Sequence, residues 1–178
     1  MVRAQRGDRQ AFGELVTRYM QRAYYAALGL VGSHDDAVDM SQEAFARAYR
    51  SHESIDPDGP FYGWIYQILR RLCFNFLRDR KSRRRRLEQR ANWLTEEASA
   101  RAASSDPARR AELTELRERL EIAIAALPDK EREALVLKDF EGLRYREIAD
   151  LLGIPMGTVM SRLYAARRSL VSLLEDRL

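Results

Sequence analysis

The sequence predicts an all-α protein made of two small helical domains joined by a flexible linker. Glycine and proline are scarce, at 9 and 5 of the 178 residues, and no segment shows the alternating pattern of a β-strand. Apolar residues instead recur three and four positions apart through most of the chain. Residues 92–105 (NWLTEEASARAASS) are rich in Ala and Ser and carry no periodic stripe, which is typical of a linker.

Three helices are predicted in the first half. Asp8 can cap the first helix, and Gly29 begins the glycine-containing stretch expected to loosen the chain after it. The second helix is expected from about Asp35 to Arg50, and the third from about Phe61 to Arg80. The buried face of the second helix would hold Ala37, Met40 or Ser41, Ala44, Phe45 and Ala48. A turn-rich loop, HESIDPDGP, separates the second helix from the third.

The second half is predicted to begin with a helix opened by Asp106-Pro107, with Asp as the N-cap and Pro in the first turn. Leu and Ile then recur at helical spacing as far as Leu127. Pro128 closes that helix, and Asp129 can cap the next one.

The stretch GLRYREIADLLGIPMGTVMSRLYAARR predicts a helix-turn-helix. Gly153 stands where the first helix must stop, and Pro155 cannot continue it. The second helix has an apolar stripe of Val159, Leu163, Ala166 and Leu170. Thr158, Ser161, Arg162 and Ala165 lie away from this stripe, which is how such a motif presents a helix to the major groove. A helical hairpin with solvated Arg residues is the alternative.

Basic charge is concentrated at the end of the third helix. The net charge is only +4, but Arg78 to Arg90 holds eight basic and two acidic residues. This predicts a polyanionic partner, with nucleic acid favoured over acidic lipid and a solvated tail as the alternative. Among the nearby aromatic residues, Trp64 is expected in the core, whereas Phe61 and Tyr62 are expected to be exposed for base stacking.

Composition argues against several other functions. Cys73 is the one cysteine, so neither an internal disulfide nor a multi-cysteine metal site is expected, and His34 and His52 have no neighbours at ligand spacing. No catalytic constellation accompanies the acidic residues. Because the chain carries neither a membrane span nor a signal-peptide core, we expect a soluble, intracellular protein. Asp39 and its neighbours Gln42 and Glu43 share one helix face, which alone would be a solvated surface.

Two stretches resemble the sigma-70 family of bacterial transcription initiation factors, and in particular its extracytoplasmic-function (ECF) subfamily. DAVDMSQEAFARAYR and GPFYGWIYQILRRLCFNFLRDR carry the resemblance in the first half. LPDKEREALVLKDFEGLRYREIADLLGIPMGTVMSRLYAARRSL carries it in the second half. The resemblance implies sigma region 2 over residues 1–90, a linker over 91–106 and sigma region 4 over 107–178.

The resemblance also implies three functional surfaces. The helix that docks on the polymerase clamp matches Asp39, Gln42, Glu43, Phe45 and Tyr49. The part that reads and melts the −10 promoter element matches Ser54, Asp56, Phe61, Tyr62, Trp64, Arg70, Arg71, Asn75 and Arg78. The part that reads the −35 element matches Tyr145, Thr158, Met160, Ser161, Arg162, Tyr164, Arg167 and Arg168.

The chain departs from the family pattern at several of these positions. Met160 stands where many members carry a basic residue, and Ala165 where many carry Arg, so two candidate contacts to the −35 element are lost. Arg144 replaces a small hydroxyl residue that would cap the following helix. In the third helix, Arg71 and Asn75 replace a frequent Asn and Asp, which makes that surface more positive.

We therefore expect a non-enzymatic sigma factor that needs no cofactor or metal and acts in the cytoplasm, on the nucleoid when active. Its expected partners are core RNA polymerase (clamp helices and flap), double-stranded promoter DNA, the melted non-template strand and an anti-sigma factor, without membrane insertion. A stand-alone helix-turn-helix regulator that binds as a dimer is the alternative. A recombinase-like enzyme would need a nucleophilic Ser or Tyr in a catalytic setting that the sequence does not offer.

Overall fold

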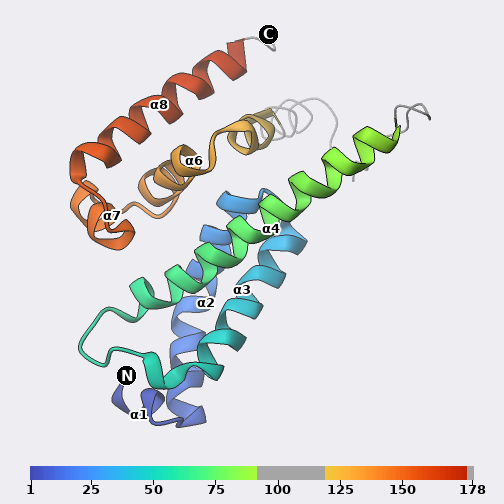
Figure 1. Ribbon diagram of the computed structural model, residues 1–178. Coiled ribbons are helices and arrows are strands. Elements are labelled where there is room, and N and C mark those ends of the chain that lie inside the picture. Colours follow the sequence, from blue (N-terminus) through green and yellow to red (C-terminus); the bar gives the residue numbers. More distant parts are fainter. Residues whose placement is uncertain (92–118, 176–178) are drawn as a thin grey trace, which may run out of the picture.

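The structure is a computed structural model that describes residues 1–91 and 119–175, with side chains described through residue 83 in the first of these ranges. The described helices are α1 (Val2–Gln5), α2 (Arg9–Val31), α3 (His34–Arg50), η1 (His52–Ser54), α4 (Phe61–Ala91), α6 (Asp129–Leu135), η2 (Val136–Phe140), α7 (Tyr145–Leu152) and α8 (Met156–Glu175). Residues 119–126 are also helical. Figure 1 shows these elements, and the described residues contain no strand, which confirms the all-α prediction. The predicted linker and the Asp106-Pro107 helix start lie outside the described residues.

The first half is a bundle in which α2, α3 and α4 pack on one another. Asp8 caps α2 as predicted, since its carboxylate accepts a hydrogen bond from the Ala11 amide at 3.0 Å. Ser33 caps α3 in the same way. The chain turns between them at Gly32, whose φ of +72° is readily adopted only by glycine.

The prediction that Gly29 loosens the chain after the first helix is wrong, because Gly29 lies inside α2. A Cβ atom at this position would lie only 2.7 Å from Cγ2 of Val136, in the second half of the chain. The glycine therefore serves close packing between distant segments, which the local sequence does not reveal.

Two predicted helix caps differ in the structure. Pro128 precedes α6, while Asp129 is its first helical residue and pairs with Arg132 at 2.6 Å instead of capping the helix. Arg144 lacks the small hydroxyl group that would cap α7. Here Glu147 supplies the cap, because its carboxylate accepts a 2.6 Å hydrogen bond from the Arg144 amide.

The two halves share one apolar core. The cluster built around Leu30, Ile65 and Leu69 of the first half also contains Leu137 and Ile148 of the second half. Figure 1 shows α6 beside the α2–α4 bundle, and contacts join α2 to both α6 and η2. The two halves are therefore packed directly against each other.

The core also contains two aromatic residues that the sequence placed at the surface. Phe61 and Tyr62 are only 2% and 7% exposed, so the prediction that they are available for base stacking is wrong for this conformation. Phe61 packs against Phe12, Tyr19 and Trp64, with Trp64 half-buried. The apolar start of α4 therefore packs in the bundle instead of facing solvent.

Among the helices of residues 1–91 and 119–175, none has the length and apolar character needed to cross a membrane.

Candidate nucleic-acid interface

The predicted helix-turn-helix is present as α7, a short turn and α8. Gly153 ends α7 with a φ of +64°, and the Ile154 amide donates to the Ala149 carbonyl at 3.1 Å. The Thr158 amide donates to the Pro155 carbonyl at 2.9 Å as α8 begins. Val159 and the later apolar residues Leu163 and Ala166 are buried, which fixes the rotation of α8 and turns its other face to solvent.

The outward face of α8 carries most of the residues predicted to read double-stranded DNA. Met160, Ser161, Tyr164, Arg167 and Arg168 are exposed, and Tyr164 is 70% exposed. Thr158, Arg162 and, at the start of α7, Tyr145 are half-buried.

Two of the basic side chains beside this face already have partners. Arg167 makes a two-oxygen contact with Asp139 at 2.8 and 3.2 Å, and this hydrogen bonding raises the pKa of the Arg167 guanidinium. The ammonium of Lys138 lies 5.2 Å from the ring centroid of Tyr145. Arg168, the next residue on α8, is exposed like Arg167.

A second basic surface runs along α4. Arg71, Asn75 and Arg78 are exposed, and Arg78 donates to the Asn75 side-chain oxygen at 3.0 Å. Ser54 and Asp56 are exposed in the preceding loop, where Asp56 accepts a hydrogen bond from the Asp58 amide at 3.1 Å. The structure thus places these five predicted residues on accessible surface, in contrast to Phe61 and Tyr62.

The polar face of α3 is a third surface, separate from the basic ones. Asp39 and Gln42 are exposed, while Glu43 is half-buried and pairs with Arg47 at 2.7 Å and Arg50 at 3.6 Å. The hydrogen bond from Arg47 lowers the pKa of Glu43, so this carboxylate is charged at neutral pH.

Two aromatic residues of the predicted polymerase surface support α3 from within the fold. Phe45 is 4% exposed and belongs to the core. Tyr49 packs edge-on against Phe12, with ring centroids 5.1 Å apart. Neither ring is therefore freely exposed to a binding partner in this conformation.

The structure also brings together six polar side chains, in two groups of three, that the sequence pattern did not connect. The carboxylate of Glu133, which is fully buried, accepts hydrogen bonds from both the Arg70 guanidinium and the Tyr66 hydroxyl, with Arg70 Nη2 3.1 Å and Tyr66 Oη 3.2 Å from its oxygens. Glu141 makes a matching contact. Its Oε2 accepts from Arg22 Nε at 2.6 Å and from Tyr62 Oη at 3.0 Å.

One contact joins Glu133 to Arg70 and Tyr66, and the other joins Glu141 to Arg22 and Tyr62. Both join the second half of the chain to the first. The Arg22 guanidinium also lies 3.6 Å from the centroid of the Tyr62 ring. The only local signal was the acidic Glu133 directly before the apolar run ALVL, because a charge in such a setting needs a buried partner.

Burial and the neighbouring carboxylates change how the two tyrosines ionise. Burial is the main cause that raises the pKa of Tyr62 and of Tyr66, and the charges of Glu141 and Glu133 add to it. The hydrogen bond to Glu133 raises the pKa of Arg70. Both hydroxyls therefore stay protonated as donors, and Arg70 stays charged.

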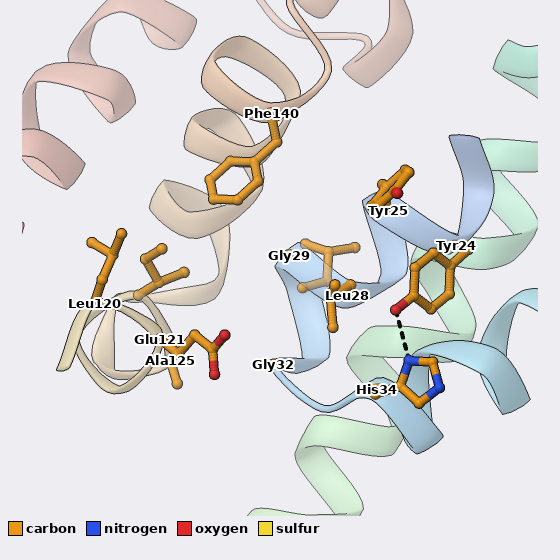
Figure 2. A pocket seen from close by; sticks show the side chains of 12 residues that line it. Tyr24, Tyr25, Leu28, Gly29, Gly32, His34, Leu120, Glu121, Ala125 and Phe140 are labelled. Carbon is orange, nitrogen blue, oxygen red and sulfur yellow. Dashed lines mark hydrogen bonds between the residues drawn. The ribbon is translucent and has the colours of Figure 1, made fainter. Parts of the chain in front are cut away.

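An apolar pocket of about 630 Å³ lies between α2 and the second half. Figure 2 shows Phe140 and Leu120 on one side of it and Tyr25 and Leu28 on the other, with the Tyr24 hydroxyl 2.8 Å from Nδ1 of His34. The two halves therefore leave a space between them along this part of their interface.

No group of acidic, His and Cys side chains in the described residues could hold a metal ion.

Comparisons with known proteins match each half of the chain to a known family. Residues 15–83 match the family described as Sigma-70 region 2, and residues 117–170 match Sigma-70, region 4. The chain is 32% identical over 182 residues to the RNA polymerase sigma-H factor of Pseudomonas aeruginosa, covering 99% of this chain and 92% of that protein. It is 34% identical over 170 residues to the ECF RNA polymerase sigma-E factor of Escherichia coli K12, covering 94% and 88%.

Solved structures show the same fold. CnrH, determined in complex with the cytosolic domain of CnrY, superposes with a TM-score of 0.70 at 25% identity, over 98% of this chain and 94% of that one. The sigma factor RpoE of Bartonella quintana, determined with the anti-sigma factor NepR, gives a TM-score of 0.65 at 23% identity, over 93% and 98%.

The chain belongs to the sigma-70 family of RNA polymerase sigma factors, in its extracytoplasmic-function subfamily. It is a transcription initiation factor, one that binds core RNA polymerase and promoter DNA.

The raised pKa values predict how the tyrosines titrate. An unfolded tyrosine ionises near pH 10, whereas folded Tyr62 and Tyr66 keep their protons above that pH. The folded state then binds more protons than the unfolded state, so their contribution to stability is complete below about pH 10 and is lost as the pH rises further.

In an absorbance titration, at least Tyr62 and Tyr66 of the eight tyrosines should ionise only together with loss of helical circular dichroism. Tyr62→Phe and Tyr66→Phe should each remove one late-titrating group. Reversible ionisation of all eight near pH 10 with the helices intact would contradict this assignment.

Proposed function

We propose that the chain divides promoter recognition and polymerase binding among the three surfaces described above. In this proposal α8 contacts the −35 element, the basic surface of α4 and its preceding loop contact the −10 element, and the polar face of α3 docks on the polymerase clamp. The proposed boundaries are residues 1–90 for region 2, 91–106 for the linker and 107–178 for region 4.

The outward face of α8 is the observation that carries the −35 assignment. A buried apolar stripe fixes the helix, and the opposite side offers hydroxyl, aromatic and guanidinium groups at its exposed positions. Such groups hydrogen-bond base edges and phosphates in a major groove. Exposed Met160 adds an apolar side chain to this otherwise polar face.

The −10 assignment is supported by the exposed polar groups of α4. Arg71 and Arg78 can neutralise phosphates, and Asn75 can donate to or accept from a base. Phe61 and Tyr62 act in this proposal by holding α4 and its loop in place, because the core already covers their rings. Of the three aromatic residues predicted for −10 contact, half-buried Trp64 is the one with surface left for stacking.

An anti-sigma factor is a further proposed partner. CnrH, similar to this chain over nearly its whole length, was determined in complex with the cytosolic domain of CnrY, and the sigma factor RpoE of Bartonella quintana was determined with the anti-sigma factor NepR. To inhibit by competition, such a partner would have to cover the Asp39-Gln42-Glu43 face or α8. We further propose that the chain has no catalytic activity of its own and acts in the cytoplasm, on the nucleoid when active.

Replacing Asp39 and Gln42 with Ala should weaken binding to core RNA polymerase and leave the fold intact, because both side chains are exposed and outside the core. Co-elution with bacterial core polymerase on a sizing column measures the effect, and circular dichroism checks the fold. Glu14→Ala with Gln21→Ala, at exposed positions of α2, is the matched control and should co-elute normally. Unchanged co-elution of the Asp39/Gln42 variant would remove the docking assignment.

Arg162→Ala should weaken promoter binding by about 1–3 kcal/mol if its guanidinium contacts a base edge. Polymerase holoenzyme binding to promoter fragments with single changes in the −35 element measures this. A base contact predicts that the loss disappears at one altered base pair. An equal loss on every sequence, with a shallower salt dependence, would instead assign Arg162 to a phosphate.

A further inference from the structure

The loop between α3 and α4 is held by α1, a helix that has no part in the proposed function so far. Figure 1 shows α1 beside the segment that follows α3, and α1 contacts both η1 and α2. Ala4 of α1 is fully buried, and the Asp8 carboxylate accepts from Arg3 Nε at 2.8 Å while it caps α2. These contacts fix α1 on the bundle, so it offers the loop a partner with a defined position.

Gln5 is the residue of α1 that binds the loop, and it does so through two hydrogen bonds. Its side-chain Nε2 donates to the Ile55 carbonyl at 2.9 Å. Its main-chain oxygen lies 2.8 Å from Nδ1 of His52. Because a carbonyl oxygen can only accept, Nδ1 of His52 must carry the proton and donate it. Gln5 therefore holds the loop at two positions, one through its side chain and one through its backbone.

The two loop residues bound by Gln5 are also packed against other parts of the first half. Ile55 is only 1% exposed, and its amide donates to the His52 carbonyl at 3.1 Å. The His52 ring lies near Tyr49, with ring centroids 5.9 Å apart. A Cβ atom at Gly7 would lie 3.2 Å from Cε1 of the same ring, so the ring also packs closely on the turn after α1. The side chain, amide and carbonyl of Ile55 therefore all have partners.

Ile55 lies between the two loop residues that are proposed to contact the −10 element. Ser54 and Asp56 are both exposed, whereas Ile55 between them is buried. Their side chains therefore leave the backbone on either side of the residue whose carbonyl is bound to Gln5. Groups that recognise a ligand must be held within about 0.5 Å of the productive geometry. The position of this backbone segment thus decides whether Ser54 and Asp56 can meet a base edge.

We propose that Gln5 and His52 are positioning residues for base selection at the −10 element. Through them, α1 holds the loop in the conformation from which Ser54 and Asp56 reach a base of the melted strand. Neither Gln5 nor His52 has to touch DNA or polymerase in this role. The inference rests on the proposed contact between the loop and the −10 element.

Loss of the two Gln5 hydrogen bonds should reduce base selectivity more than it reduces total DNA binding. Contacts to phosphates, such as those proposed for Arg71 and Arg78, supply affinity without regard to sequence. The affinity for the preferred base falls with the fraction of molecules in which the loop has the competent conformation. Affinity for the other bases does not depend on that conformation. The ratio of the two affinities therefore reports on the positioning role.

Two variants each remove one of these hydrogen bonds and keep the shape of the side chain. Gln5→Glu replaces the N–H donor with an acceptor, and His52→Phe keeps a ring beside Tyr49 but removes Nδ1. His52→Asn carries an amide donor close to the position of Nδ1 and should restore the second bond. Gln10→Glu, at an exposed position of α2, makes the same charge change away from the loop and is the matched control.

The first measurement is hydrogen–deuterium exchange of residues 51–60 in the whole, free chain. Gln5→Glu and His52→Phe should each raise the exchange rate of this loop about threefold to tenfold, since loss of one hydrogen bond shifts an equilibrium by about that factor. Gln10→Glu and His52→Asn should exchange like the wild type. Thermal unfolding and co-elution with core polymerase check that every variant is folded and still docks.

The second measurement uses holoenzyme assembled from each variant and core polymerase. The probe is a library of DNA duplexes with a randomised, unpaired non-template segment, and the bound molecules are sequenced. The ratio of the preferred base to the other three at the most selective position should fall about threefold to tenfold for Gln5→Glu and His52→Phe. Total binding should change by less than about twofold, because the phosphate contacts remain. His52→Asn should keep the wild-type ratio.

Three results would overturn the proposal. Unchanged exchange of the loop in both Gln5→Glu and His52→Phe would mean that α1 does not fix the loop. Faster exchange with an unchanged base ratio would mean that the loop conformation does not decide base selection. An equal loss of binding on every sequence would mean that α1 contacts DNA or polymerase directly. Failure of the −10 assignment itself would appear separately, as a base ratio that Ser54→Ala with Asp56→Ala leaves unchanged.

Discussion

The buried carboxylate of Glu133, which lies between the two halves of the chain, is the constraint on which their arrangement depends. A buried charge needs partners, and removing one partner of such a pair costs about 3–5 kcal/mol. Arg70 and Tyr66 supply those partners from region 2, and Arg22 and Tyr62 do the same for Glu141. Both carboxylates therefore favour the arrangement in which the two halves are packed together.

The shared core explains why the two regions rest on each other at all. Each region is small, and Leu137 and Ile148 of region 4 bury themselves in the same cluster as Ile65 and Leu69 of region 2. Tyr62 lies in the same cluster, with its hydroxyl bonded to Glu141 of the second half. The exposed functional groups that remain lie on the outer faces of α3, α4 and α8, which stay accessible in the closed arrangement.

Sequence reasoning predicted the local features because they depend on neighbouring residues. Apolar spacing located the helices, Asp8 and Gly153 marked helix ends correctly, and the polar face of α3 is exposed as expected. It failed where distant residues decide the outcome. Gly29 packs against a residue more than a hundred positions away, and Glu133 pairs with Arg70 across 63 positions. No local pattern encodes such pairs, so the burial of Tyr62 could not be foreseen either.

The most direct test of this account is small-angle X-ray scattering from the free, wild-type chain at moderate salt. A closed chain of this length should have a radius of gyration near 16 Å. A value close to this, rising when Glu133 and Glu141 are both replaced by Gln, is the predicted result. A wild-type value well above about 20 Å, unchanged by the substitutions, would show that the two regions are already apart and would contradict the account.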